Sequence, residues 1–206
     1  MSVCMIGFYG ESKTGKTTLI TRLIKRLKKE GYNIIAIKQT DKPISIDTRY
    51  KDTWRYIENG AAIAIFKSKI ETDMIIKKNM RITDIINLLE SISSFDCVLI
   101  EGAKDPDIPK IRIDKSIERS NTILDYQGDF EGLYRYIKSL IKKEKKKKHR
   151  ISLFVNGEHV PLSDFPSEII SNLLIAVALS LKGVNHVDTL QVTLNTTKER
   201  REKLKL

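Results

Sequence analysis

Cysteine, histidine and tryptophan are scarce in this sequence. Its 206 residues include two cysteines, three histidines and one tryptophan. Cys4 and Cys97 lie far apart, each in an apolar strand-like run, so they form neither a disulfide framework nor a metal-ligand spacing. We therefore expect two buried, reduced thiols, and structural or solvated roles for His149, His159 and His186.

Long apolar runs are also missing. The longest candidate, Ile169 to Leu181, is shorter than a membrane-spanning helix and contains Ser and Asn. The apolar N-terminal run has no basic flank before it and no small-residue cleavage pattern after it, which argues against a secretory signal. We expect a cytoplasmic protein with no membrane partner.

The positive charge is concentrated in two segments. The formal net charge is +11, and residues 142–150 supply seven basic residues against one acidic residue. Residues 198–205 supply five basic residues against two acidic ones. Such runs are typical of solvated, flexible segments, and the first contains no aromatic side chain that could stack on bases. We interpret them as a linker and a tail, and a nucleic-acid partner is not favoured.

Apolar periodicity predicts an α/β fold. An apolar strand at Val3 to Tyr9 is followed by an amphipathic helix at Gly15 to Glu30 and a second strand at Asn33 to Lys38. This βαβ order predicts a mostly parallel sheet flanked by helices. Further strands are expected at 62–68, 72–77, 96–100 and 110–113, and further helices at 51–59, 82–92 and 130–141.

A small second unit is expected after the lysine-rich run. Asn156-Gly157 between two short apolar segments predicts a hairpin, and Ser163 to Pro166 begins a helix that Gly183 ends. Alternating apolar residues at Val187 to Leu194 predict a last strand. The chain is thus divided into a nucleotide-binding domain at 1–141, a linker at 142–150, a β-β-α-β unit at 151–195 and a tail at 196–206.

A phosphate-binding loop lies between the first strand and the first helix. Residues 10–17, GESKTGKT, match the pattern G-x-x-x-x-G-K-[ST]. Gly10 and Gly15 allow a tight turn that brings backbone amides to phosphate oxygens, and the helix N-terminus points at the same charge. The expected nucleotide-binding residues include Ser12, Lys13 and Thr14. Lys16 is expected to reach the β- and γ-phosphates and Thr17 to bind Mg²⁺, which makes them the catalytic candidates. The sequence therefore predicts a P-loop NTPase.

The metal requires a further acidic group, and two candidates are apparent. Glu101 follows the apolar strand that ends at Ile100, where a parallel sheet presents its ligand-binding edge. Asp47 lies in the loop after the second strand. No N-K-x-D motif is present, so the residues alone do not identify the base.

The ordered set of motifs resembles a known family. The P-loop at 10–18 is followed by Ile46-Asp47, by 51–55 (KDTWR), by 59–62 (NGAA) and by 99–104 (LIEGAK). This order resembles MobB, the family of GTP-binding adaptors of molybdopterin-guanine dinucleotide biosynthesis. Gln39, Asp41-Lys42 and Tyr50 depart from the family pattern of histidines and glycine. The C-terminal unit resembles an extension seen on archaeal MobB-like proteins.

The resemblance implies functions for particular residues. Lys13 to Thr18 would bind the phosphates of GTP, with Gly102 beside them, and Thr17, Asp47 and Glu101 would surround Mg²⁺. It also implies a homodimer that partners a MobA-like guanylyltransferase and molybdopterin or its guanine dinucleotide. At most a slow GTPase is expected, because no general base is evident.

Two other functions remain open from the residues alone. A small-molecule kinase could use the same loop, although no arginine-rich lid is visible around Arg49, Arg55 or Arg112. A nucleic-acid-associated NTPase could use the lysine-rich run at 142–150.

Overall fold

The computed structural model describes residues 3–90, 92–145, 151, 153–156, 158–187 and 190–194. The chain divides into two compact units. One is Met5–Leu133, and the other combines Met1–Cys4 with Tyr134–Leu206. Each unit is described by itself.

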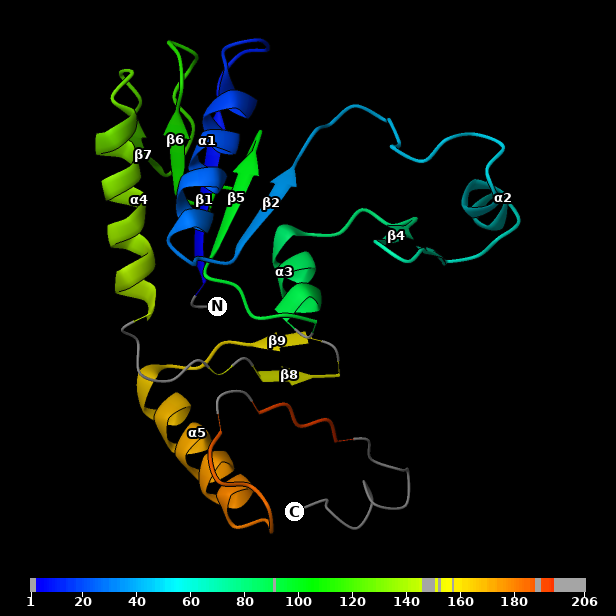
Figure 1. Ribbon diagram of the computed structural model, residues 1–206, viewed down its shortest axis with the longest axis vertical. Helices are drawn as coiled ribbons and strands as arrows, with labels where there is room; N and C mark the ends of the chain where they lie inside the picture. Colours follow the sequence, from blue (N-terminus) through cyan, green and yellow to red (C-terminus); the bar gives the residue numbers. More distant parts are fainter. Residues whose placement is uncertain are drawn as a thin grey trace. The chain divides into compact units, whose positions relative to one another are not determined.

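The first unit is built on a five-stranded sheet (Figure 1). The strand order is β2-β5-β1-β6-β7, and the pairs β2–β5, β1–β6 and β6–β7 are parallel. The expected α/β class with a mostly parallel sheet is confirmed. The strands are β1 (Cys4–Tyr9), β2 (Ile34–Lys38), β5 (Cys97–Glu101), β6 (Lys110–Arg112) and β7 (Thr122–Asp125).

Apolar central strands form the core of this unit. The four residues Cys97 to Ile100 of β5 are all buried, as parallel strands covered on both faces require. Helix α1 (Lys16–Lys29) contacts β5 and β2 and buries Leu19, Ile20, Leu23 and Leu27, the face that its periodicity predicts. Cys4 and Cys97 are both buried free thiols, as expected.

A helix and a hairpin are inserted between β2 and β5. Helix α2 (Asp52–Glu58) contacts strand β3 (Ile63–Lys67), which pairs antiparallel with β4 (Thr72–Ile76). Helix α3 (Ile82–Glu90) follows. All four elements lie within a few residues of their predicted bounds.

Two elements differ from expectation in this part of the chain. Strand β7 was not predicted, because it has four residues and a register shift separates its pairing with Lys110 from that with Ile111. Helix α4 (Phe130–Lys145) continues past the predicted end at Ile141, since lysines are good helix formers and favour a helix C-terminus. The remaining residues of the predicted linker, 146–150, lie outside the described residues.

The C-terminal segment contains a hairpin and a helix. Strands β8 (Leu153–Val155) and β9 (Glu158–Val160) pair antiparallel, and Asn156 has a φ of 54°, the left-handed conformation expected of such a turn. Helix α5 (Asp164–Leu179) follows. The predicted strand at Val187 to Leu194 is wrong for the described residues 187 and 190–194, which form no strand. Alternation alone does not make a strand, because its backbone needs a partner. The predicted tail at 196–206 lies outside the described residues.

Candidate functional site

The loop between β1 and α1 has the backbone shape of a phosphate cradle. Gly10 has a φ of 152° and Gly15 a φ of 85°, and Lys13 is also left-handed at 66°. Positive φ values are cheap at glycine and turn successive amides toward one point. Helix α1 begins at Lys16. Its first turn contains no acidic residue that would compete with a bound anion for the free backbone amides.

The side chains of the loop fold back over it. Lys16 Nζ donates to the carbonyl of Glu11 and lies 3.2 Å from Thr14 Oγ1. Thr14 Oγ1 also donates to the Glu11 carbonyl at 2.9 Å. The ammonium group is therefore held against the loop, where a polyphosphate would meet it.

The structure brings Thr17 and Glu101 together. Thr17 Oγ1 lies 3.0 Å from Glu101 Oε1 and 2.9 Å from Oε2, and it donates to this carboxylate. Glu101 ends β5, pairs in register with Lys38 at the end of β2, and lies 3.7 Å from Lys38 Nζ. A hydroxyl and a carboxylate are the hard oxygen donors that Mg²⁺ accepts, so these residues fit the metal.

Asp47 lies elsewhere in this unit. Its Oδ1 accepts a hydrogen bond from Thr53 Oγ1 at 3.0 Å, and its backbone amide donates to Ser45 Oγ. Within the described part of the chain, no hydrogen bond or ion pair joins Asp47 to Thr17 or Glu101. The described residues also include no group of three or more His, Cys, Asp or Glu side chains that could hold a metal.

The other predicted site residues lie around the loop. Ser12 is exposed, and Thr18 is exposed on the first turn of α1. Gly102 has a φ of 81°, and a Cβ there would lie 2.5 Å from the Gln39 carbonyl oxygen. Its amide donates to the Phe8 carbonyl at 2.8 Å. Gly102 thus lets the end of β5 approach the end of β2 closely, beside Glu101.

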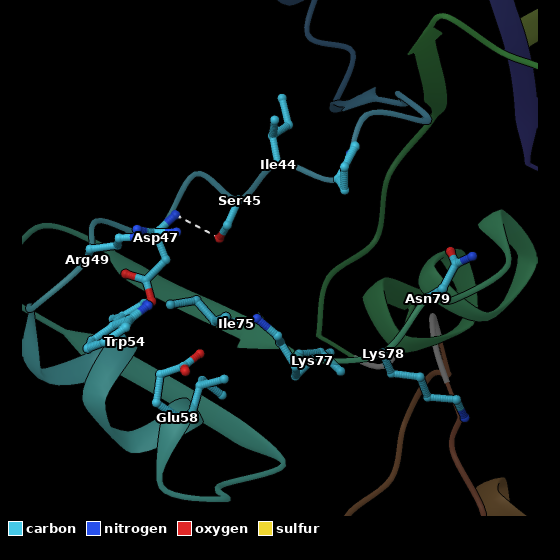
Figure 2. Close-up of a pocket in the computed structure, with 13 residues that line it drawn as sticks. Ile44, Ser45, Asp47, Arg49, Trp54, Glu58, Ile75, Lys77, Lys78 and Asn79 are labelled. Atoms are coloured by element: carbon cyan, nitrogen blue, oxygen red, sulfur yellow. Dashed lines mark hydrogen bonds between the residues drawn. The ribbon is translucent and has the colours of Figure 1, made fainter.

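Predicted site residues contribute to the lining of two hollows among the described residues. A small one, about 230 Å³, adjoins the loop and is lined by Thr14, Gly15, Thr18, Leu19, Arg22, Ile113 and Tyr126. A larger one, about 620 Å³, lies between the β2–α2 loop, α2 and β4 (Figure 2). Figure 2 shows Asp47, Arg49 and Trp54 gathered at one side of it and Lys77 and Lys78 along the other.

Sequence reasoning missed two residues at the sheet. Asp114 follows β6 and accepts a hydrogen bond from the backbone amide of Glu11 in the loop. Its position directly after a strand is the same signal that identified Glu101. Lys110 in β6 is fully buried, and its Nζ donates to the carbonyls of Ile108 and Ser120. Burial lowers the pKa of Lys110, but no sequence pattern distinguishes such a lysine from an exposed one.

Arg112 forms an ion pair within the sheet. Its Nε lies 2.7 Å from Asp125 Oδ1 and its Nη2 lies 2.6 Å from Oδ2, which joins β6 to β7. This engagement leaves Arg112 poorly placed to act in a mobile kinase lid.

None of the described helices is long and apolar enough to cross a membrane.

Comparison with known proteins agrees with this geometry. The family model for molybdopterin guanine dinucleotide synthesis protein B, MobB, matches residues 5–129. A putative molybdopterin-guanine dinucleotide biosynthesis adapter protein of Methanocaldococcus jannaschii is 26% identical over 237 residues, which cover 94% of this chain and 98% of that protein. The corresponding adapter protein of Haemophilus influenzae is 31% identical over 109 residues, covering 52% of this chain and 61% of that protein.

A solved structure supports the fold as well. The crystal structure of Bacillus subtilis MobB is similar with a TM-score of 0.56 at 23% identity, covering 66% of this chain and 97% of that one. At this identity the similarity concerns the fold alone. The family model, however, spans more than half of the chain and includes the loop, β5 and β6. The chain belongs to the MobB family of molybdopterin guanine dinucleotide synthesis proteins.

Proposed function

We propose that this chain is a GTP-binding adaptor in molybdopterin-guanine dinucleotide biosynthesis that binds GTP with Mg²⁺ and hydrolyses it slowly. The observation that carries the proposal is the P-loop with Thr17 hydrogen-bonded to Glu101 beside it. Family membership, and relatives that are named as adapters of this pathway, support the biosynthetic role.

The phosphates would be bound by the loop and the first turn of α1. The amides between Ser12 and Thr18 are the proposed donors, and Lys16 supplies the positive charge that the β- and γ-phosphates need. Its ammonium group already lies against the loop, beside Thr14. The N-terminus of α1 adds its dipole to the same charge.

Mg²⁺ would be held at Thr17 and Glu101, with phosphate oxygens and water completing its shell. The bound ion would neutralise the charge that develops on the phosphates during transfer. Of these two residues, Glu101 has a side chain that is only 17% exposed, whereas Thr17 is exposed. A metal role for Asp47 remains a prediction, because its carboxylate binds Thr53 in the larger cavity.

Slow hydrolysis follows from what surrounds this site. The unit Met5–Leu133 contains no histidine, and Glu101 is committed to Thr17 and Lys38. The carboxylate of Asp114, which also bonds to the loop, accepts a backbone amide. A clamp of positive charge and metal without a positioned base accelerates phosphoryl transfer to water only modestly.

The small hollow beside the loop is the proposed site of the base and ribose. It shares Thr14, Gly15 and Thr18 with the phosphate cradle, so a nucleotide bound by its phosphates would extend into it. Tyr126 offers a ring that can stack on a purine, and the Arg22 guanidinium, which lies 4.1 Å over the Phe130 ring, adds a positive charge to the lining. The preference for guanine is a proposal that rests on the family.

The larger cavity is the proposed site for molybdopterin or its guanine dinucleotide. Trp54 offers a face for a planar heterocycle, while Arg49, Lys77 and Lys78 offer cations for its phosphate. Arg49→Ala should weaken molybdopterin binding and leave GTP affinity unchanged, since no lining residue is shared with the loop. Equal loss of both ligands would contradict this assignment.

A homodimer is proposed on the β3–β4 hairpin. Ile63, Ile65 and Met74 share one face of it and are 50%, 55% and 44% exposed. Adjoining exposed apolar side chains of this size mark interaction surfaces. Ile65→Lys should shift the mass measured by light scattering from dimer to monomer.

A MobA-like guanylyltransferase is the proposed enzyme partner, and it is testable by co-purification with this chain.

Lys16→Ala tests the nucleotide assignment directly. The variant should lose triphosphate affinity by at least about a hundredfold while its thermal unfolding stays close to that of the wild type, because Lys16 is only partly buried and lies outside the apolar core. Arg26→Ala, which removes a cation from the exposed face of the same helix, is the matched control. Unchanged GTP affinity in Lys16→Ala would refute the site.

A further inference from the structure

Asp114 is placed by strand pairing against the start of the phosphate-binding loop. Strand β6 pairs with β1 in the register Tyr9↔Arg112, and the Ile113 amide donates to the Tyr9 carbonyl at 3.0 Å. The pairing therefore continues one residue beyond β6. Gly10 directly follows Tyr9, the last residue of β1, and Asp114 directly follows Ile113.

The Asp114 carboxylate contacts both of the first two residues of the loop. Its Oδ2 accepts a hydrogen bond from the Glu11 amide at 2.5 Å. A Cβ on Gly10 would lie 2.9 Å from Oδ2 and 3.0 Å from both Cγ and Oδ1. The carboxylate thus occupies the space that the missing side chain of Gly10 leaves open.

Asp114 is itself held in position. Its Oδ1 accepts a hydrogen bond from the Ser116 amide at 2.9 Å. Hydrogen bonding from Ser116, then the bond from the Glu11 amide and the positive charge of Lys16, hold the pKa of Asp114 below its usual value. The side chain is consequently a charged acceptor at neutral pH, with both oxygens engaged.

We propose that Asp114 is a positioning residue for the phosphate-binding loop, which fixes the chain at Gly10 and Glu11 so that the amides beyond converge on a polyphosphate. This inference rests on the proposed nucleotide binding. Among the described residues, the hydrogen bonds of Asp114 reach only Glu11 and Ser116. It therefore fixes the first residues of the loop, Gly10 and Glu11, and leaves the amides after Glu11 available to a ligand.

The position of this anchor matters for binding. An amide that is fixed before the ligand arrives does not have to be ordered when it binds, so a positioned loop retains more of the interaction free energy. A charge-assisted bond to a backbone amide is stronger than a neutral one. Loss of the anchor should therefore lower the affinity for any nucleotide that uses the cradle, diphosphate as well as triphosphate.

The test compares Asp114→Ala and Asp114→Asn with a matched control. Asp96→Ala removes a carboxylate that accepts a backbone amide at 2.7 Å, that of Asn33, just before β2 and β5 begin. It lies at the opposite edge of the sheet from the loop. GTP and GDP are titrated calorimetrically in the presence of Mg²⁺, well below the unfolding temperature of each variant, and hydrogen exchange is followed in the peptide that contains Glu11.

Asp114→Ala should weaken GTP and GDP binding by about tenfold or more and speed exchange at Glu11. Asp114→Asn should fall between Asp114→Ala and the wild type, because its single amide oxygen can replace only one of the two carboxylate oxygens that accept the Glu11 and Ser116 amides. Asp96→Ala should lose stability without losing affinity. This pattern would establish the positioning role.

Other results would overturn it. Unchanged nucleotide binding by Asp114→Ala would show that the carboxylate has no effect on affinity. Tighter binding would show that it repels the phosphates. Equal losses in Asp114→Ala and Asp96→Ala would show an effect of stability alone. If the wild-type protein binds neither nucleotide, the proposed function fails, while unchanged exchange at Glu11 in Asp114→Ala would by itself refute the positioning role.

Discussion

Replacing Glu101 by glutamine should separate metal binding from phosphate binding at the loop. The carboxylate accepts the Thr17 hydroxyl with both oxygens, at 3.0 and 2.9 Å, and its side chain is only 17% exposed. Glutamine has nearly the same shape and keeps one oxygen acceptor, but it removes the negative charge that a divalent cation needs. The fold and the backbone cradle should remain as they are.

The magnitude follows from the place of Glu101 in the proposed metal site. Whether it binds Mg²⁺ directly or orients a bound water, loss of such a carboxylate costs about 10–100-fold in metal affinity. This corresponds to about 1.4–2.7 kcal/mol. Lys38, 3.7 Å away, loses its partner at the same time, so the net positive charge near the phosphates rises. Metal-free GTP binding should therefore stay equal or become slightly tighter.

Calorimetric titration of GTP with Mg²⁺ and with a chelator measures both quantities. The prediction is a Glu101→Gln variant that loses most of the Mg²⁺-dependent gain in affinity and keeps the metal-free affinity. Asp47→Asn is the comparison variant, because the Asp47 carboxylate accepts a hydrogen bond from Thr53. Equal losses with and without metal would remove Glu101 from the metal site. A loss of the Mg²⁺ effect in Asp47→Asn alone would move the metal to the β2–α2 loop.

Three further predictions concern the sheet around the site. Lys110→Met should lower the free energy of unfolding by about 1–3 kcal/mol in urea titrations, because the buried Ile108 carbonyl and the partly buried hydrogen bond to Ser120 lose their donor; an unchanged midpoint would contradict a stabilising role for these hydrogen bonds. Gly102→Ala should cost about 1–3 kcal/mol, since its φ is 81° and the new Cβ would lie 2.5 Å from a backbone oxygen, and a neutral result would show that the β5 end can relax. The hydrogen bond from Arg112 lowers the pKa of Asp125, so this carboxylate binds a proton more readily in the unfolded chain. Its stabilisation is complete above the unfolded pKa of about 3.9 and is lost as the pH falls through the lower folded value. Asp125→Asn should therefore flatten the acid-side decline of thermal stability below about pH 4, and a variant with the wild-type slope would refute this account.

The backbone shape of the loop at Gly10 to Thr17 and the main sheet were predictable because their signals are local. Gly10 to Thr17 follow an apolar strand and begin an amphipathic helix, which is the structural context that the motif requires. Glu101 was found by a rule of topology, since the carboxyl ends of parallel strands meet at one edge. The structure places it against Thr17, as that rule requires.

The features that were missed depend on pairing between distant segments. Strand β7 has only four residues and is recognisable through its parallel pairing with β6. Asp114 acquires its role from the register of β6 against β1, which brings it to Gly10 and Glu11 across about a hundred residues of sequence. From the sequence, Lys110 is expected to be an exposed strand residue. In the structure, its Nζ donates to the carbonyls of Ile108 and Ser120.

The predicted strand at Val187 to Leu194 failed for the converse reason. Its apolar alternation is a local signal, but a strand also needs a partner for its backbone groups. The only strands described after α4 are β8 and β9, which pair with each other. A pattern of alternating side chains is therefore insufficient where the backbone pairs with no neighbouring strand.

The most direct test of the central claim is calorimetric titration of the full chain with GTP and with ATP, each with and without Mg²⁺. The account predicts selective binding of GTP, one nucleotide per chain, strengthened by Mg²⁺ and abolished in Lys16→Ala. Selective binding of ATP, or GTP binding that survives in Lys16→Ala, would contradict it.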